Sequence, residues 1–203
     1  MEVSRPTPLP LDERSALLRT AGREAALLLG ASIFLALTAR ISLPLPFWPV
    51  PITGQTLGVL LVGTLFGPRR GAAAVAAYVL EGLAGLPVFA GGAAGIGVLF
   101  GPTGGFLVGF VPAAAIAGAM AGTTRPVWLR LIGLLLASLA IYLVGVPWSA
   151  VVTGAPWSMA ILYGLLPFLP GDAVKAALAA AVTPAGAAWL ARTGLLPRAP
   201  GPT

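Results

Sequence analysis

The stretch "LPFLPGDAVKAALAAAV", residues 166–182, has the composition of a membrane-spanning helix, yet it carries two ionisable groups. Asp172 stands three residues before Lys175, which is the only lysine in the chain. An ionisable group inside a membrane span costs roughly 2.5 to 3.5 kcal/mol on insertion scales, and by default it marks a functional site. The stretch therefore predicts both a membrane helix and a candidate binding site.

The composition of the whole chain supports a membrane protein. Of its 203 residues, 58% are hydrophobic and 9% are charged, whereas soluble domains carry about 25% charged residues. This length allows one domain with about six spans of roughly 20 residues each. We expect an all-α integral membrane protein, folded as a compact bundle of six transmembrane helices.

The residues that are missing exclude several function classes. The chain has no cysteine and no histidine, so it lacks the commonest metal ligands and the usual general base. We expect no metal site. The net charge of +6 does not indicate a nucleic-acid partner, because the arginines are scattered between apolar segments and form no dense basic face.

Apolar windows separated by Pro/Gly clusters define the expected spans. They cover residues 24–42, 54–67, 72–86, 104–122, 127–147 and 171–192. Residues 157–166 are too short to span and precede two prolines, so we expect a short helix at the interface or folded back into the protein. The expected organisation is a cytoplasmic leader at 1–23, a membrane substrate-binding domain at 24–193 and a cytoplasmic tail at 194–203.

The arginines predict the orientation in the membrane. With six spans, one side of the membrane holds Arg14, Arg19, Arg23, Arg69, Arg70, Arg125, Arg130, Arg192 and Arg198, and the other side holds only Arg40. Cytoplasmic connections carry the excess of Lys and Arg. We therefore expect a multi-pass protein of the cytoplasmic (inner) membrane with both termini in the cytoplasm.

A glycine-rich connection, "GLPVFAGGAAGIGVLFGPTGG" at 85–105, is expected on the outer side. Irregular backbone at membrane depth persists only where protein buries it or where it lines a cavity. One interpretation is a lid or wall over an outward-facing pocket. An ordinary flexible loop is an equally good interpretation.

The ionisable and polar residues within the spans have structural alternatives to ligand binding. Asp172 could cap the start of a helix, could pair with Lys175 one turn away, or could bind a ligand. Gln55 could contact an amide-like or ureido ligand or could bond another helix. Glu81 could serve a site, pair with Arg40 or cap backbone. The small residues Ala26, Gly30 and Ala31 could pack inside the bundle or dock a separate membrane subunit.

Four segments, in order, carry a resemblance to a known family. They are "VPITGQTLGVLLVGTLFGPRRG", "GLPVFAGG", "GVLFGPTGGFLVGF" and "LPFLPGDAVKA". Together they resemble the BioY family, the biotin-specific S-components of energy-coupling factor (ECF) transporters. The resemblance implies a non-enzymatic subunit for biotin uptake that works with an EcfT-like transmembrane subunit and two ABC ATPase subunits. It implies no cofactor in this chain, because the partner subunits use the ATP.

The resemblance also implies a set of site residues. It places Asp172 and Lys175 on the polar groups of biotin, with Asp172 accepting from a ureido N–H and Lys175 serving the carboxylate or the ureido oxygen. The full expected substrate set is Asp172, Lys175, Gln55, Phe89, Gly91, Gly92, Thr103, Tyr78 and Glu81, and the expected docking set is Ala21, Ala25, Ala26 and Gly30. The chain departs from some members at Ala93 and Ala94, where they carry a polar residue.

Two other functions are weighed against this one. The same scaffold would serve an S-component for another water-soluble vitamin, although a cationic vitamin such as thiamine would sit badly beside Lys175. An intramembrane enzyme could use Asp172 or Glu81 as general acid or base. The sequence offers no assembled nucleophile, base and oxyanion group for such an enzyme.

Overall fold

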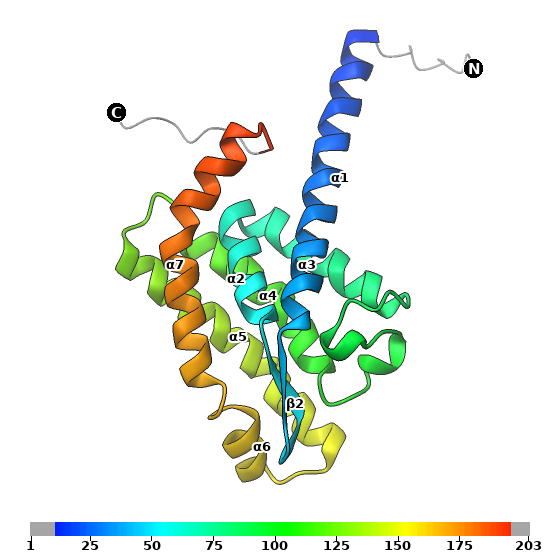
Figure 1. Ribbon diagram of the computed structural model, residues 1–203, viewed down its shortest axis with the longest axis vertical. Helices are drawn as coiled ribbons and strands as arrows, with labels where there is room; N and C mark the ends of the chain where they lie inside the picture. The colour runs from blue at the N-terminus through cyan, green and yellow to red at the C-terminus, as the bar shows by residue number, and fades with distance from the viewer. Residues whose placement is uncertain (1–10, 196–203) are drawn as a thin grey trace, which may run out of the picture.

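The structure is a computed structural model that describes residues 11–195 of the chain (Figure 1). The described chain forms seven α-helices, a two-stranded hairpin and two short 3-10 turns. In order, these are α1 (Leu11–Arg40), β1 (Ser42–Leu45), β2 (Trp48–Thr53), α2 (Gln55–Phe66), α3 (Pro68–Leu83), η1 (Ala90–Gly92), η2 (Ile96–Val98), α4 (Gly104–Met120), α5 (Val127–Thr153), α6 (Trp157–Gly164) and α7 (Leu169–Arg192).

Six of these helices correspond to the six predicted spans, and α6 is the short helix expected near 157–166. Helices α1, α5 and α7 are long and apolar enough to cross a membrane, whereas α2 and α4 are shorter apolar helices. The start of α1 and the end of α7 lie at the same end of the bundle, opposite the hairpin and α6 (Figure 1). An even number of crossings produces this arrangement.

Helix α1 begins earlier than its apolar window predicts. It starts at Leu11 rather than near 24, with Asp12 and Glu13 in its first turn, where the positive end of the helix dipole favours carboxylates. The described part of the expected leader is therefore helical. The rest of that leader, and most of the expected tail, lie outside the described residues.

The hairpin β1–β2 is an element that the sequence did not predict. Its strands pair antiparallel, Ser42 with Thr53 and Leu45 with Trp48, with an irregularity between Leu43 and Leu45. Prolines argue against a strand because they cannot donate to the ladder, but edge strands tolerate them. Both strands of a two-stranded ribbon are edge strands, so this proline-rich segment can still pair.

Small residues bring the central helices into close contact. A Cβ atom added to Gly109 of α4 would lie 3.0 Å from the Ile141 backbone of α5. Between α2 and α3, Gly67 has a φ of 81°, which suits glycine and separates the two helices. Close backbone approach of this kind is typical of membrane helix bundles.

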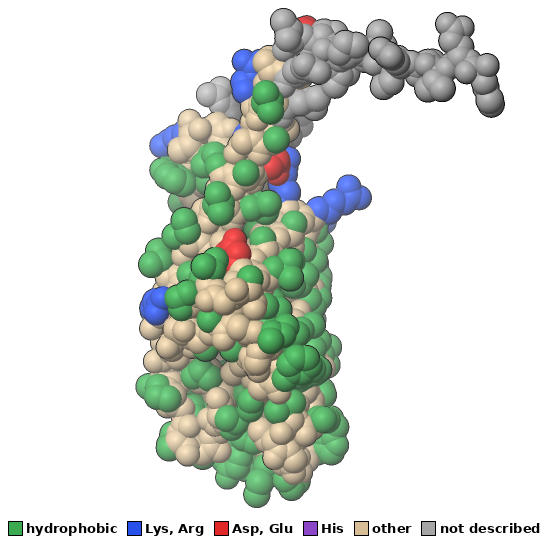
Figure 2. All heavy atoms as spheres, turned by 90° about the vertical axis from the view of Figure 1, so that its right-hand side faces the viewer, with side chains coloured by type: hydrophobic (Ala, Val, Ile, Leu, Met, Phe, Trp, Pro, Cys, Tyr) green, Lys and Arg blue, Asp and Glu red, His purple; other side chains and the backbone are tan. Residues whose placement is uncertain are grey.

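The outward faces of the bundle are apolar. On α1, Leu29, Ile33 and Leu37 are each about 60% exposed (58%, 61% and 63%). Hydrophobic side chains are spread over the face drawn in Figure 2, and its lower part shows no charged side chain. Large contiguous apolar surfaces of this kind mark membrane or protein interaction. The protein is an integral membrane protein.

One buried charge has a structural role at the end of the bundle where the termini lie. Arg130 of α5 is only 3% exposed, and it donates to the carbonyls of Ala180 (2.6 Å), Thr123 (3.2 Å) and Arg125 (3.0 Å). Pro184 lies within α7 and has no N–H to donate to Ala180, the residue four positions earlier. Arg130 therefore supplies the hydrogen bond that Pro184 removes.

Candidate functional site

A cavity of about 290 Å³ lies between the hairpin, the glycine-rich loop and helices α2, α4, α5 and α7. It is lined by Pro49, Val50, Pro51, Thr53, Gln55, Thr56, Phe89, Ala90, Ala93, Val98, Thr103, Phe106, Leu107, Phe110, Ile141, Tyr142, Phe168 and Lys175. Small-molecule pockets usually have this character: mostly apolar, with a few convergent polar groups, and about 300 Å³ or more in volume.

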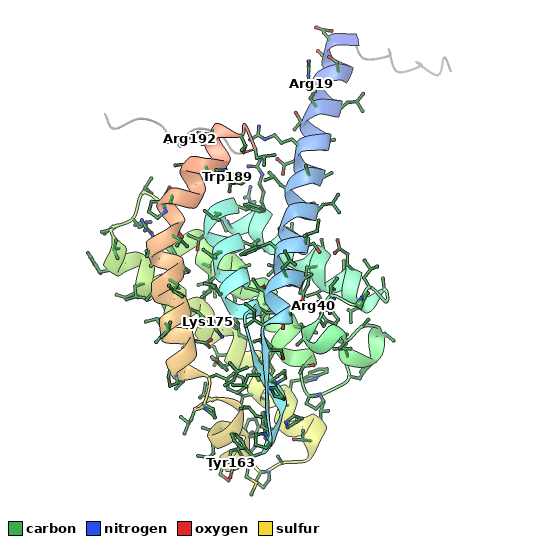
Figure 3. The ribbon with its side chains drawn as sticks, in the orientation of Figure 1. Arg19, Arg40, Tyr163, Lys175, Trp189 and Arg192 are labelled. Carbon is green, nitrogen blue, oxygen red and sulfur yellow. The ribbon has the colours of Figure 1, made fainter. Side chains whose placement is uncertain are left out.

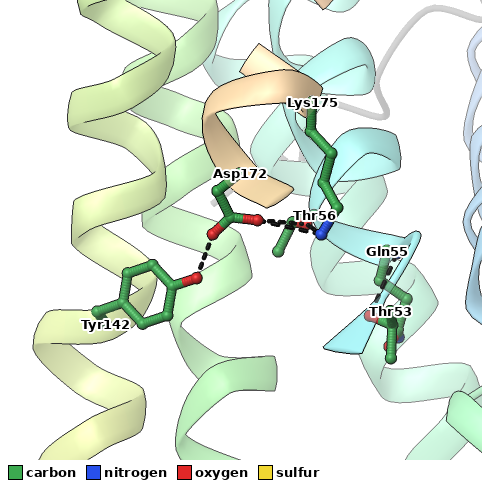
Figure 4. A network of polar contacts seen from close by, with 6 residues as sticks. All are labelled: Thr53, Gln55, Thr56, Tyr142, Asp172 and Lys175. Carbon is green, nitrogen blue, oxygen red and sulfur yellow. Dashed lines mark hydrogen bonds and ion pairs between the residues drawn. The ribbon is translucent and has the colours of Figure 1, made fainter. Parts of the chain in front are cut away.

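The polar groups of the cavity gather around Asp172 in the first turn of α7 (Figure 4). The Asp172 carboxylate is 3% exposed, and it accepts hydrogen bonds from Tyr142, Thr56 and Lys175. The Lys175 Nζ lies 3.1 Å from Asp172 Oδ1 and 2.7 Å from Thr56 Oγ1. The ion pair is thus formed, and no side-chain cap bond forms at the start of α7.

Hydrogen-bond capacity remains on the cavity wall after these contacts. An ammonium has three N–H donors, and Lys175 uses two of them within the described chain, on Thr56 and Asp172. The hydroxyl of Tyr142 donates to Asp172, so its oxygen can still accept from a ligand. The site therefore offers a cationic donor and a neutral acceptor side by side.

A second polar group lies where α2 meets the glycine-rich loop. Gln55 donates from Nε2 to the Tyr78 hydroxyl at 2.7 Å, and Tyr78 donates to the Val88 carbonyl at 2.8 Å. The Phe89 ring packs edge-on to Tyr78 and covers Gly82. This chain of contacts fixes the loop, and in the described chain it leaves the Gln55 carbonyl oxygen available to a ligand.

Three aromatic rings form the wall next to the charged cluster. Phe106 stacks on Phe168 with ring centres 6.5 Å apart, and Tyr142 meets both rings at 6.2 and 6.3 Å. All three belong to the cavity lining. An aromatic wall beside a polar cluster suits a small ring system with polar atoms on its edge.

The predicted substrate residues occupy different positions relative to this cavity. Lys175, Gln55, Phe89 and Thr103 line it. Asp172 and Tyr78 lie behind the lining, each hydrogen-bonded to lining residues. Gly91 lines a separate outer recess, which is formed by Arg40 with residues of β1, β2 and η1. Gly92 lies against Arg40. Glu81 bonds Ser32 of α1 and is not in contact with the cavity; the pairing with Arg40 that the sequence allowed is not formed.

The predicted docking residues divide in a similar way. Ala26 and Gly30 line an apolar groove of about 350 Å³ between α1, α2 and α7, beside Leu61 and Trp189. Ala21 and Ala25 are exposed on α1 but do not line this groove.

Sequence reasoning missed Tyr142 as a member of the polar cluster. It lies in the apolar run "GLLLASLAIYLVGV" of α5, where a tyrosine has the appearance of a core aromatic. Its contact with Asp172 joins residues 30 positions apart. The only available signal was that a buried Tyr hydroxyl usually finds a partner, and the sequence does not say which one.

A bundle with apolar outer faces and a buried cavity that holds one charged cluster defines a membrane protein that binds a small molecule. The model of the BioY family matches residues 13–192. The chain therefore belongs to the BioY family.

Individual relatives agree with this assignment. The "Biotin transporter BioY" of Rhizobium etli is 36% identical over 159 residues, which cover 74% of this chain and 84% of that protein. The "Probable biotin transporter BioY" of Pyrococcus horikoshii is 41% identical over 151 residues, covering 73% and 88%. A crystal structure of the S-component for biotin from an ECF-type ABC transporter superimposes with a TM-score of 0.72 at 25% identity, covering 88% of this chain and 94% of that one.

Proposed function

We propose that this chain is the biotin-binding S-component of an ECF-type transporter for biotin uptake. The observation that carries the proposal is the cavity with the charged cluster of Asp172, Lys175, Thr56 and Tyr142 at its wall. Family membership and the names of the relatives support the choice of ligand.

The chemistry of biotin suits this cavity. Biotin has a fused ring pair with a ureido group, a thioether and a valerate carboxylate, so it needs an apolar pocket with a few polar anchors. The stacked rings of Phe106 and Phe168 would cover the ring pair. Lys175 would donate its remaining N–H to the carboxylate or the ureido oxygen, and Tyr142 and Gln55 would accept from ureido N–H groups.

The role that we propose for Asp172 follows from its position behind the lining. Its two oxygens already accept from three donors of this chain. Asp172 is only 3% exposed and does not line the cavity, so a ureido N–H could reach its carboxylate only if a lining side chain such as Tyr142 or Thr56 moved aside. We therefore place Lys175 and Tyr142 in contact with biotin, with Asp172 holding both.

The partners and the orientation are part of the same proposal. The arginine distribution supports an orientation with both termini in the cytoplasm and a location in the inner membrane. The S-component would work with an EcfT-like transmembrane subunit and two ATPases. The apolar groove beside Ala26 and Gly30 is a candidate face for that subunit, because small residues allow close helix packing.

The proposal is tested by ligand binding to the purified protein in detergent. A site ligand raises the melting temperature by mass action. Biotin should raise it, and thiamine and riboflavin should not. A shift with riboflavin or thiamine in place of biotin would favour an S-component for another vitamin, and no shift with any of the three would refute the proposal.

A further inference from the structure

A second hollow lies on the other side of the hairpin from the ligand cavity. This outer recess has a volume of about 650 Å³ and is lined by residues of β1, β2 and η1 together with Arg40. Pro49, Pro51 and Ala90 line both the outer recess and the inner cavity. Only β2 and the start of η1 therefore separate the two hollows.

Among the described residues, Arg40 is the only charged one in the lining of the outer recess. Its Nη2 donates to the Pro87 carbonyl at 3.0 Å, and a Cβ atom added to Gly92 would lie 3.4 Å from its Nη1. Within residues 11–195 it makes no ion pair. One hydrogen bond uses one of the five N–H donors of a guanidinium, so this cation is held in place with most of its donors free.

The two cations of this part of the molecule lie on opposite sides of one thin wall. Arg40 belongs to the outer recess and Lys175 belongs to the inner cavity. Figure 3 shows them at similar heights in the bundle, between Trp189 at one end and Tyr163 at the other. Arg40 is exposed to solvent, and low-dielectric walls such as Leu45 and Trp48 focus the field of its charge within the recess.

We propose that the outer recess is a first binding site for an organic carboxylate, which Arg40 attracts before the ligand passes β2 into the inner cavity. The inference rests on the proposed function, since biotin supplies the carboxylate. Gly91 lines this recess and Gly92 packs on Arg40. Both glycines have positive φ, 65° and 78°, and this loop conformation leaves space for the guanidinium.

The test is the rate of biotin association measured by stopped-flow tryptophan fluorescence on the full chain in detergent. Arg40→Gln should slow biotin roughly two- to fivefold and Arg40→Glu should slow it further, as expected when a rim charge is removed or reversed. Arg40→Lys keeps the charge and should remain close to wild type. Biotinamide, which lacks the negative charge, should associate at the wild-type rate in all three variants.

Arg69→Gln is the matched control, because it removes one exposed arginine from α3 outside both hollows. It should leave both association rates unchanged. If Arg40→Gln slows biotinamide as much as biotin, the residue acts through the Pro87 contact and the inference is overturned. Wild-type biotin rates in both Arg40→Gln and Arg40→Glu would also overturn it. That result would leave the proposed function intact. A wild-type chain that does not bind biotin would instead overturn both the proposed function and the inference about the outer recess.

Discussion

Residues 11–195 contain two buried charged groups that differ in their surroundings. Asp172 and Lys175 at the start of α7 border a cavity, and Lys175 keeps a donor that no described residue uses. Arg130 at the start of α5 donates to three backbone carbonyls, and its buried Nε has no partner in the described chain. It lines neither this cavity nor the other two hollows, so no ligand could reach that unused donor. A buried charge thus indicates a binding site only when it has unused hydrogen-bond capacity and adjacent space.

We expect the largest effect from Arg130→Met, which should lower the stability of the fold. Removing the guanidinium leaves the Ala180 carbonyl buried without a donor, because Pro184 cannot supply one. We expect a loss of about 2 to 4 kcal/mol in stability, seen as a lower melting temperature in detergent. The affinity of the folded fraction for biotin should not change.

The control for this variant is Arg125→Met, which removes an exposed arginine close to the same loop. It should leave the free energy of unfolding within about 0.5 kcal/mol of the wild-type value. An Arg130→Met protein as stable as this control would show that the three carbonyl contacts contribute nothing.

Lys175→Met is the counterpart of Arg130→Met in the other charged group, and it should act mainly on biotin binding. It keeps most of the side-chain stem while deleting the charge and the unused donor. Loss of a charge-assisted hydrogen bond costs about 1.5 to 3 kcal/mol, so the affinity for biotin should fall roughly 10- to 150-fold. A variant that binds biotin normally but melts much earlier would make the ion pair structural, like Arg130.

Tyr142→Phe tests whether the hydroxyl behind the cavity wall belongs to the site. The ring contacts with Phe106 and Phe168 remain, while the bond to Asp172 and the acceptor for the ligand are lost. The expected cost of about 1 kcal/mol lowers biotin affinity roughly fivefold in a calorimetric titration. Tyr163→Phe on α6, outside the cavity lining, should bind as wild type does, and equal losses in both variants would argue against a specific role for Tyr142.

The smallest effect is expected when Pro184→Ala is combined with the Arg130 change. Alanine restores an N–H that can donate to the Ala180 carbonyl, so Arg130→Met should cost about 1 kcal/mol less in this background. Melting curves of the two single variants and the double variant give this coupling. Strict additivity would mean that Arg130 does not compensate for the proline.

Much of this architecture was predictable from composition and local pattern. Apolar windows and Pro/Gly clusters located the six long helices and the short α6, and the cost of charge in a membrane singled out Asp172 and Lys175. Both signals are local, so one sequence is enough to read them. The hairpin was missed because Pro44, Pro49 and Pro51 argue against strands. Edge strands tolerate proline, but only the pairing of the two segments shows that both strands are edge strands.

The remaining features depend on which side chains meet across the bundle. Tyr142 and Asp172 lie in different helices, and no periodicity in an apolar run indicates that they are partners. Arg130 was predicted as one of the arginines that fix orientation, but it is turned inward by the carbonyl that Pro184 frees 50 residues away. The biotin contacts expected of Glu81, Gly91 and Gly92 stay predictions, although none of the three lines the inner cavity.

The most direct test of the central claim is a calorimetric titration of biotin into the Asp172→Asn variant. Asparagine has nearly the same shape as aspartate, so this change keeps the packing and removes the charge that holds Lys175 and Tyr142. If the cluster is the ligand site, Lys175 and Tyr142 lose the group that positions them, and affinity should fall roughly fivefold or more, the equivalent of at least one hydrogen bond of about 1 kcal/mol. Wild-type affinity in this variant would contradict the account and would leave Asp172 and Lys175 a structural pair.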